Sequence, residues 1–473
     1  MAPAAKIKFG TDGWRGIIAE DYTFANVRRV AAAVADSIRA KRRSSRGVVV
    51  GYDARFQSDR FALAAAEVLA AHTIPVALAD RPTPTPALSY AVIARRAAGA
   101  IVITASHNPY YWNGFKLKAP EGCSVSLRLT RDIERRIPRK WPPDSPPRRR
   151  KPAPIETVDL VTPYLKDLET FIDFDKIRAS GLRFVADAMH GAGRHCLGRL
   201  FERHGIPHRE IRNDLNPLFP GINPEPIDPH VEALRQAVVK SGYDAGFALD
   251  GDGDRIGAMD RRGGFVDSHK VFSLLFRHLY EGRGLQGEVV KGFASTTLID
   301  KLAAKYGLRL HVTPIGFKYI SDIILERDVL IGGEESGGIT VKGRPPERDG
   351  VLCSLLLAEM MAHHGKGLEE LIAEFDREFG EHHYQRVDLR IGLDKARKVA
   401  SLVQNGKLNQ VAGLKVTGTD TLDGVKLWFG PSTWLLVRPS GTEDLLRLYA
   451  EAPTKEQLGS ILEEMKKFTR KHA

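Results

Sequence analysis

Short apolar runs alternate with helical segments through the first three-quarters of the chain. Three runs have the length and composition of buried strands: residues 47–53, 182–187 and 287–292. Three stretches that follow them have helical composition or spacing: residues 61–71, 231–241 and 297–306. Because strands that alternate with helices build sheets covered by helices, this pattern predicts repeated α/β domains.

The chain is also too long for a single hydrophobic core. Its 473 residues exceed the roughly 100–200 residues of an ordinary domain, so we expect four domains. The proline-rich stretch 138–154 suits a linker, because proline supports neither a helix nor a central strand. The last part predicts a smaller α+β domain, with strands at 385–391 and 434–438 and a terminal helix from Lys455. The predicted domains cover residues 1–151, 152–257, 258–379 and 380–473.

The composition, with 43% hydrophobic and 27% charged residues, is typical of a folded globular protein. No apolar run reaches the roughly 20 residues that span a bilayer, and the N-terminus lacks an apolar signal core. We therefore expect a cytoplasmic protein without a membrane partner. The net charge of +12 makes nucleic-acid binding an alternative, but the basic clusters at 41–43 and 148–151 are typical of solvated loops. Positive charge suits an anionic small substrate equally well, so we expect no nucleic-acid partner.

A serine hydroxyl stands where a buried strand is expected to end. Ser106 and His107 follow the apolar run 100–103. Serine needs activation or strong local charge to react at phosphorus, and alone it would be a turn-capping residue. Because His107 is adjacent in sequence, it suits an orienting or charge-stabilising role better than that of a triad base. Lys116 is interpreted as a general acid or base whose pKa nearby cations such as Arg15 would lower; the alternative is an ordinary surface lysine.

A second apolar run, residues 245–249, is followed by three aspartates at alternate positions. Asp250, Asp252 and Asp254 are separated by glycines, a spacing that lets several carboxylates face one hard divalent cation. An EF-hand is excluded, because the twelfth position of such a loop holds Arg261 instead of glutamate. A surface turn is disfavoured by the mutual repulsion of the carboxylates unless a cation or Arg255 offsets it. A serine together with a carboxylate cation loop predicts phosphoryl transfer.

Two further loops carry groups that suit a phosphorylated sugar. Glu334 and Ser336 stand in a glycine-framed loop and offer acceptors for neighbouring ring hydroxyls. Arg438, Ser440 and Thr442 combine a guanidinium with two hydroxyls, which suits a phosphate that is held but not transferred. Each loop alone would be an ordinary solvated turn. Because they lie in different domains from the serine, we expect a site in a cleft between domains.

Five motifs in order make the chain resemble the α-D-phosphohexomutase family over its full length. The motifs occupy residues 10–16, 104–109, 250–255, 333–337 and 438–444. The resemblance implies a heart-shaped molecule with three similar mixed α/β domains and a smaller α+β C-terminal domain. Each domain would contribute one loop to a central cleft.

The resemblance also implies a role for each matching residue. Ser106 would be a phosphoserine that accepts and donates a phosphoryl group, with the other catalytic residues Lys116, His107 and Arg15 around it. A Mg²⁺ ion would be bound by Ser106, Asp250, Asp252 and Asp254. The expected substrate-binding residues are Glu334, Ser336, Arg438, Ser440, Gly441, Thr442 and Arg255. The family mechanism passes through a hexose 1,6-bisphosphate, which also serves as activator, in a monomer or homodimer that binds hexose phosphates.

The sugar is less constrained than the reaction. Glu335 makes the sugar loop nearer to the glucose type, while Gly338 replaces the histidine usual in the glucosamine and dual glucose/mannose members. Glucose 1-phosphate is the first expectation, with mannose 1-phosphate open as a second substrate and phosphoglucosamine mutase as the alternative enzyme. A non-catalytic sugar-phosphate or nucleic-acid binding protein is an alternative of another class. An aspartate-nucleophile phosphatase is a third, since it also uses clustered aspartates and Mg²⁺.

Overall fold

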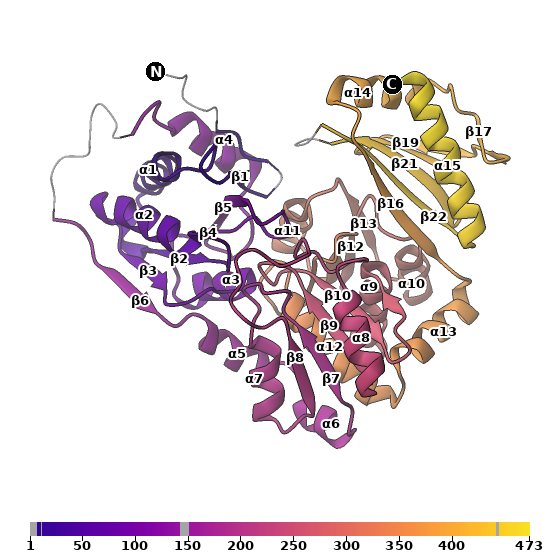
Figure 1. Cartoon of the computed structure of the whole chain (residues 1–473), viewed down its shortest axis with the longest axis horizontal. Coiled ribbons are helices and arrows are strands. Elements are labelled where there is room, and N and C mark those ends of the chain that lie inside the picture. Colours follow the sequence, from indigo (N-terminus) through magenta and orange to yellow (C-terminus); the bar gives the residue numbers. More distant parts are fainter. Residues whose placement is uncertain (1–6, 11, 142–150, 441–443) are drawn as a thin grey trace.

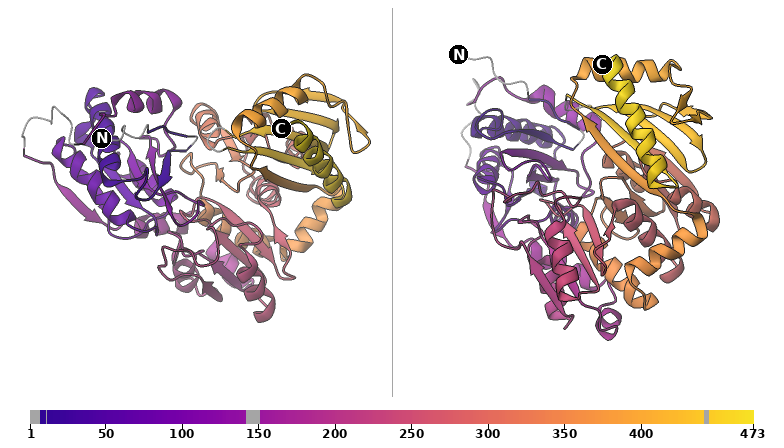
Figure 2. Two further views of the ribbon diagram at one scale, coloured as in Figure 1. Left: turned by 45° about the horizontal axis from the view of Figure 1, so that its top comes forward. Right: turned by 45° about the vertical axis from the view of Figure 1, so that its right-hand side comes forward.

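The computed structural model describes residues 7–10, 12–141, 151–440 and 444–473. These residues form four main sheets, each in its own part of a heart-shaped molecule (Figure 1). The N-terminal part, in indigo and purple, and the C-terminal part, in yellow, form two upper lobes above a narrower base (Figures 1 and 2). The prediction of three mixed α/β domains followed by a smaller α+β domain is confirmed.

The first sheet mixes parallel and antiparallel strands. Its order is β1-β5-β4-β2-β3-β6, with β1 and β5 antiparallel to their neighbours. The strands are β1 (Trp14–Ile17), β2 (Val48–Tyr52), β3 (Val76–Ala79), β4 (Ala100–Ile103), β5 (Trp112–Lys118) and β6 (Ile155–Val158). One face packs on α1 (Phe24–Ala40), α2 (Ser58–Ala71) and α4 (Leu127–Arg136), and the other on α3 (Thr85–Ala94). β6 lies beyond the predicted division at residue 151 and still pairs with β3.

The second sheet has the order β11-β10-β9-β7-β8. Its strands are β7 (Phe184–Asp187), β8 (His208–Ile211), β9 (Ala245–Leu249), β10 (Ile256–Asp260) and β11 (Phe265–Val266). The helices here are α5 (Val161–Glu169), α6 (Phe174–Ala179), α7 (Cys196–Arg203) and α8 (Glu232–Ser241). β11 lies beyond the predicted division at residue 257 but pairs with β10. The domain divisions therefore stay predictions.

The third sheet, β13-β12-β14-β15, shares one hydrophobic core with the second. Its strands are β12 (Glu288–Gly292), β13 (Leu310–Thr313), β14 (Val329–Gly333) and β15 (Ile339–Val341). The helices are α9 (Ser268–Arg277), α10 (Leu298–Tyr306), α11 (Phe317–Glu326), α12 (Gly350–His364) and α13 (Leu368–Phe379). Apolar α12 is buried along most of its length and contacts both β9 and β15. It therefore fixes the second and third sheets against each other.

The fourth sheet is antiparallel, with the order β16-β22-β21-β20-β19. Its strands are β16 (His383–Leu389), β19 (Gly418–Asp420), β20 (Val425–Gly430), β21 (Thr433–Pro439) and β22 (Leu446–Ala452). Helices α14 (Leu393–Gln404) and α15 (Lys455–His472) cover it, and a small hairpin joins β17 (Gln410–Val411) to β18 (Leu414–Lys415). The predicted strands and terminal helix of this domain are confirmed.

Two sequence-based expectations fall outside the described residues. Most of the predicted linker 138–154 and residues 148–150 of the second basic cluster lie there. Within the described part of the chain, no helix is long and apolar enough to cross a bilayer.

Candidate active site

Ser106 lies in a strained turn directly after β4. Its φ of 52° is in the left-handed region that residues other than glycine rarely adopt. Thr104 Oγ1 accepts a 2.8 Å hydrogen bond from the Ser106 amide, and Arg55 Nη2 donates to the Ser106 carbonyl at 2.6 Å. The Ser106 hydroxyl donates a 2.6 Å hydrogen bond to Asp250 Oδ2 and lies 3.2 Å from His107 Nδ1. The turn therefore aims a buried hydroxyl at the carboxylate loop of the second domain.

The three aspartates form a buried group of oxygen ligands. One carboxylate oxygen from each lies within 4.8 Å of the others. Asp250 Oδ1 accepts hydrogen bonds from the amides of Asp254 and Arg255, but Oδ1 of Asp252 and Oδ1 of Asp254 are buried without a hydrogen bond within the described residues. Burial and the other two carboxylates raise the pKa of Asp250 well above its usual range. Buried, unbonded, mutually repelling oxygens are a donor set that fits a hard divalent cation.

Close backbone approach brings the serine and aspartate loops together. A Cβ on Gly251 would lie 2.3 Å from the Ser106 carbonyl oxygen, so only glycine permits this contact. Thr85, at the start of α3, donates its hydroxyl to Asp252 Oδ2 at 2.7 Å and its amide to the Asp252 carbonyl at 2.9 Å. The first domain therefore holds the loop of Asp250, Asp252 and Asp254, called the metal loop after its expected role, from two sides.

Lys116, on β5, points into this group of carboxylates. Its Nζ lies 2.8 Å from Asp252 Oδ2, 3.2 Å from Asp254 Oδ2 and 2.9 Å from Asp12 Oδ2. Burial alone would lower the pKa of Lys116, but these three carboxylates raise it above its ordinary value. The expectation that cations such as Arg15 lower this pKa is wrong, because the nearest groups are anionic. Arg15 donates instead to Asn108 Oδ1 at 2.5 Å, within the serine loop.

His107 and Arg255 stand beside the same loops. Removal from water and the positive charges of Arg255 and Arg15 hold the pKa of His107 well below its usual range. Both effects favour the neutral form of the imidazole. Arg255 is buried next to the aspartates, with Nε 3.8 Å from Asp254 Oδ1. Its substrate-binding role stays a prediction.

Arg348 connects three domains and was missed by the sequence reasoning. Its Nη2 lies 2.5 Å from Asp12 Oδ2 and 2.8 Å from Asp254 Oδ2, and its Nη1 lies 3.5 Å from Glu334 Oε1. The guanidinium also lies over the ring of Phe317, at 5.5 Å. A signal was available, since three charged residues, Glu347, Arg348 and Asp349, stand directly before an apolar helix.

The expected sugar loop packs against the strand that follows the metal loop. Ser336 Oγ donates to Glu334 Oε1 at 2.9 Å, and burial raises the pKa of Glu334. The amide of Ile256 on β10 donates to the Gly337 carbonyl at 3.2 Å, and a Cβ on Gly337 would lie 2.7 Å from the Ile256 carbonyl. The serine, metal and sugar loops are thus in one continuous network.

The fourth-domain loop is linked to the third domain through Asp423. Arg438 Nε donates to Asp423 Oδ1 at 2.8 Å, and Asp423 Oδ2 accepts from the amide of Ile315 at 2.9 Å. Within the described residues, the Arg438 side chain donates to Asp423 and not to the serine or metal loop. Ser440 is buried, with its amide donating to the Leu445 carbonyl. Gly441 and Thr442 lie outside the described residues.

Two further arginines of the fourth domain belong to this side of the site. Arg447 on β22 pairs in register with Arg438 on β21. Arg386 on β16 forms a 3.6 Å ion pair with Glu225 of the second domain. Neither stands in a recognisable motif, and only the strand register brings Arg447 beside Arg438.

Comparison with known proteins gives a consistent result along the chain. Sequence models of the phosphoglucomutase/phosphomannomutase family match in order: α/β/α domain I at residues 6–141, domain II at 162–264, domain III at 267–378 and the C-terminal domain at 395–468. A phosphoglucomutase/phosphomannomutase of Thermococcus kodakarensis is 30% identical over 467 residues, covering 96% of each chain. A phosphoglucosamine mutase of Carboxydothermus hydrogenoformans is 29% identical, covering 97% of this chain and 98% of that protein. A crystal structure from Thermus thermophilus, described as a phosphomannomutase, has a TM-score of 0.86 and 36% identity, covering 99% of this chain and 100% of that one.

Proposed function

Since the chain belongs to the α-D-phosphohexomutase family of isomerases, we propose that it interconverts hexose 1-phosphate and hexose 6-phosphate through a phosphoserine at Ser106. The observation that carries this proposal is the 2.6 Å hydrogen bond from the Ser106 hydroxyl to Asp250, beside two buried carboxylate oxygens that have no hydrogen bond within the described residues. A serine that attacks a substrate in hydrolysis would need a general base beside it, whereas Ser106 stands beside a group of carboxylates that suits a cation.

The aspartates Asp250, Asp252 and Asp254, together with an oxygen on Ser106, would hold Mg²⁺. The bound ion would offset negative charge on the transferring phosphoryl oxygens. Lys116 and Arg15 would also offset the negative charge on the phosphoryl oxygens. Lys116 Nζ is held among the carboxylates, and Arg15 is held by its hydrogen bond to the serine loop. Neutral His107 would orient the Ser106 oxygen through Nδ1.

The proposed reaction conserves phosphate. The P–O bond to Ser106 breaks as a sugar hydroxyl loses its proton and forms a new P–O bond, giving a hexose 1,6-bisphosphate. This intermediate turns round in the site, and Ser106 takes the other phosphoryl group as its former sugar oxygen regains a proton. Arg438 and Ser440 would hold the phosphate that is not transferred, whichever end it occupies. Hexose 1,6-bisphosphate from solution would activate enzyme whose serine has lost its phosphate.

The substrate we propose first is glucose 1-phosphate. Glu334 is buried and accepts a hydrogen bond from the half-buried Ser336, with Arg348 on the same carboxylate, so the loop offers a fixed acceptor pair for ring hydroxyls. Mannose 1-phosphate is a second candidate. Similarity to a phosphoglucosamine mutase of comparable identity favours glucosamine 1-phosphate as the alternative. We place the enzyme in the cytoplasm, as a monomer or homodimer.

The test is a comparison of the three hexose 1-phosphates in coupled assays that contain Mg²⁺ and the matching 1,6-bisphosphate. We expect the highest kcat/KM for glucose 1-phosphate. A preference for glucosamine 1-phosphate would replace the sugar assignment, and no isomerisation of any of the three would contradict the proposed function. Net release of phosphate would instead favour an aspartate-nucleophile phosphatase.

A further inference from the structure

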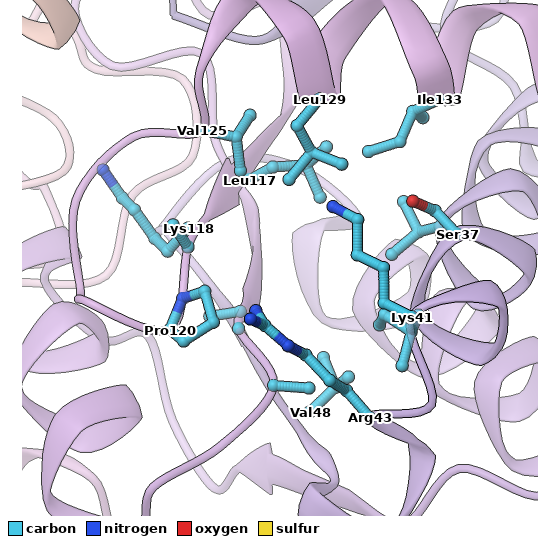
Figure 3. A pocket seen from close by; sticks show the side chains of 16 residues that line it. Ser37, Lys41, Arg43, Val48, Leu117, Lys118, Pro120, Val125, Leu129 and Ile133 are labelled. Carbon is cyan, nitrogen blue, oxygen red and sulfur yellow. The ribbon is translucent and has the colours of Figure 1, made fainter. Parts of the chain in front are cut away.

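A recess in the first domain lies apart from the aspartate, sugar and phosphate loops. It opens between α1, α4 and the adjoining ends of β4 and β5 (Figure 3). It is a shallow recess of about 50 Å³, open to solvent at its mouth. Its wall is mainly apolar, formed by Val34, Ile38, Val48, Leu117, Val125, Leu129 and Ile133. A mainly apolar wall with a few polar groups at its edge is typical of sites that bind small molecules.

Two cations at this recess form no ion pair within the described part of the chain. The side chains of Lys41 and Arg43 lie beside its apolar wall (Figure 3). Neither has a side-chain hydrogen bond or an ion pair in the part of the chain that the structure describes. The nearby carboxylate of Asp132 is already bonded to Ser37 Oγ at 3.0 Å and to Arg136 at 3.0 Å.

A third lysine lines the recess only with its stem. Lys118 Nζ points away from Lys41 and Arg43 (Figure 3), forms an ion pair with the buried Glu347, and lies 3.4 Å from Ser124 Oγ. Its charge is therefore neutralised within the protein. The charges at the recess that lack an ion pair belong to Lys41 and Arg43. Burial and Arg43 lower the pKa of Lys41, and Asp132 offsets this only in part.

We propose that this recess binds a soluble amphiphilic anion, a small molecule with an apolar body and a single carboxylate or phosphate group. The body would cover the apolar wall, which removes that surface from water. The head group would lie between Lys41 and Arg43, where partly exposed cations favour an anion over a neutral group of equal size. The ligand is distinct from a hexose phosphate, which has no apolar body to bury against Leu117 or Ile133.

The test uses the full chain and two probes of equal length, octanoate and octanol, below their aggregation concentrations. Isothermal titration calorimetry is expected to show one octanoate per chain, bound roughly fivefold to tenfold more tightly than octanol. K41A/R43A is expected to remove this preference while leaving octanol binding unchanged. K395A/K398A, which removes two exposed lysines from α14, is the charge-matched control and is expected to bind as wild type does.

Val125→Trp provides the second arm, because a larger side chain at the rim fills the recess without removing charge. It is expected to abolish binding of both probes, with the folded state checked by circular dichroism. Equal affinity for octanoate and octanol in the wild type, unchanged binding to Val125→Trp, or no binding of either probe would overturn the proposal. Binding of the protein to phosphatidylserine vesicles without binding of soluble octanoate would also overturn the proposal, because it would indicate that the recess binds a membrane surface. None of these readouts depends on mutase activity, so the proposal can fail without the proposed function failing.

Discussion

The stem of Arg348 occupies the space where a side chain at Gly338 would begin. A Cβ at position 338 would lie 2.2 Å from Arg348 Cδ and 2.6 Å from its Cγ. Gly338 therefore allows Arg348 to reach Glu334 and Asp254, and the arginine sets the charge around the sugar loop. This gives a physical reason for a glycine at position 338, where the family resemblance led us to expect a histidine.

Gly338→His should displace Arg348. We expect kcat/KM for glucose 1-phosphate to fall by roughly 10–100-fold, because misplacing a positioning group by about 1 Å has an effect of that size. Gly430→Ala is the matched control, since a Cβ there meets nothing within 4 Å. Steady-state kinetics on both variants check this, and a Gly338→His enzyme as active as the control would show that the position tolerates a side chain.

Asp252→Asn should weaken Mg²⁺ binding. The substitution removes one charge of a three-carboxylate group that lies within 4.8 Å, so we expect at least a tenfold loss of Mg²⁺ affinity. Titration calorimetry of the metal-free chain measures it, with the exposed Asp59→Asn as control. Unchanged Mg²⁺ affinity in Asp252→Asn would place the ion elsewhere. Chelation by EDTA should abolish mutase activity, and added Mg²⁺ should restore it.

Arg438→Ala should weaken catalysis in both directions. The bisphosphate must bind in two orientations, so a group that holds the distal phosphate serves the forward and the reverse reaction alike. We expect kcat/KM to fall by roughly 10–100-fold each way, as for loss of a charged hydrogen-bonding group. Arg397→Ala, on the exposed side of α14, is the control. Forward and reverse rates equal to wild type would show that this loop does not hold the phosphate.

Glu451→Gln should destabilise the protein in a pH-dependent way. Glu451 is buried and accepts hydrogen bonds from Trp434 Nε1 at 2.6 Å and the Thr297 amide at 2.9 Å. Burial alone would raise its pKa, but His382 and the hydrogen bonds lower it to about 2. A carboxylate whose pKa is lower in the folded than in the unfolded state stabilises the fold at pH values above its unfolded-state pKa. This stabilisation is lost as the pH falls towards the folded-state pKa.

The expected loss in Glu451→Gln is therefore ~2–3 kcal/mol near pH 7. The difference from wild type should shrink as pH falls from about 4.5 towards 2. Urea unfolding midpoints at several pH values measure this, with the exposed Glu456→Gln as control. A constant difference between wild type and Glu451→Gln across that range would mean that the carboxylate charge contributes nothing.

The helices, strands and main loops could be predicted from the sequence because each depends on residues that are neighbours in the chain. Buried runs such as 100–103 and 245–249 became β4 and β9 with unchanged ends, since a short apolar run with a polar turn after it has one simple structure. The contacts between domains are not local. The approach of Arg348 to Asp12 joins residues 336 positions apart, and no motif spacing encodes it.

The same limit explains the error about Lys116. Its sequence neighbourhood contains cations, whereas strand pairing and the metal loop surround it with Asp12, Asp252 and Asp254. A pKa depends on neighbours in space, so it could not be predicted before the loops were placed. Arg447 beside Arg438 was missed for a related reason, because that pair depends on the register of β21 and β22.

The most direct test of the central claim is the intact mass of the purified enzyme after incubation with glucose 1,6-bisphosphate. A phosphoserine mechanism predicts a gain of one phosphate group, about 80 Da, on Ser106, lost on addition of excess glucose 1-phosphate as glucose 1,6-bisphosphate forms. Ser106→Ala should show no gain and no mutase activity. A wild-type enzyme that isomerises glucose 1-phosphate without ever carrying this phosphate, or that carries it on an aspartate, would contradict the mechanism.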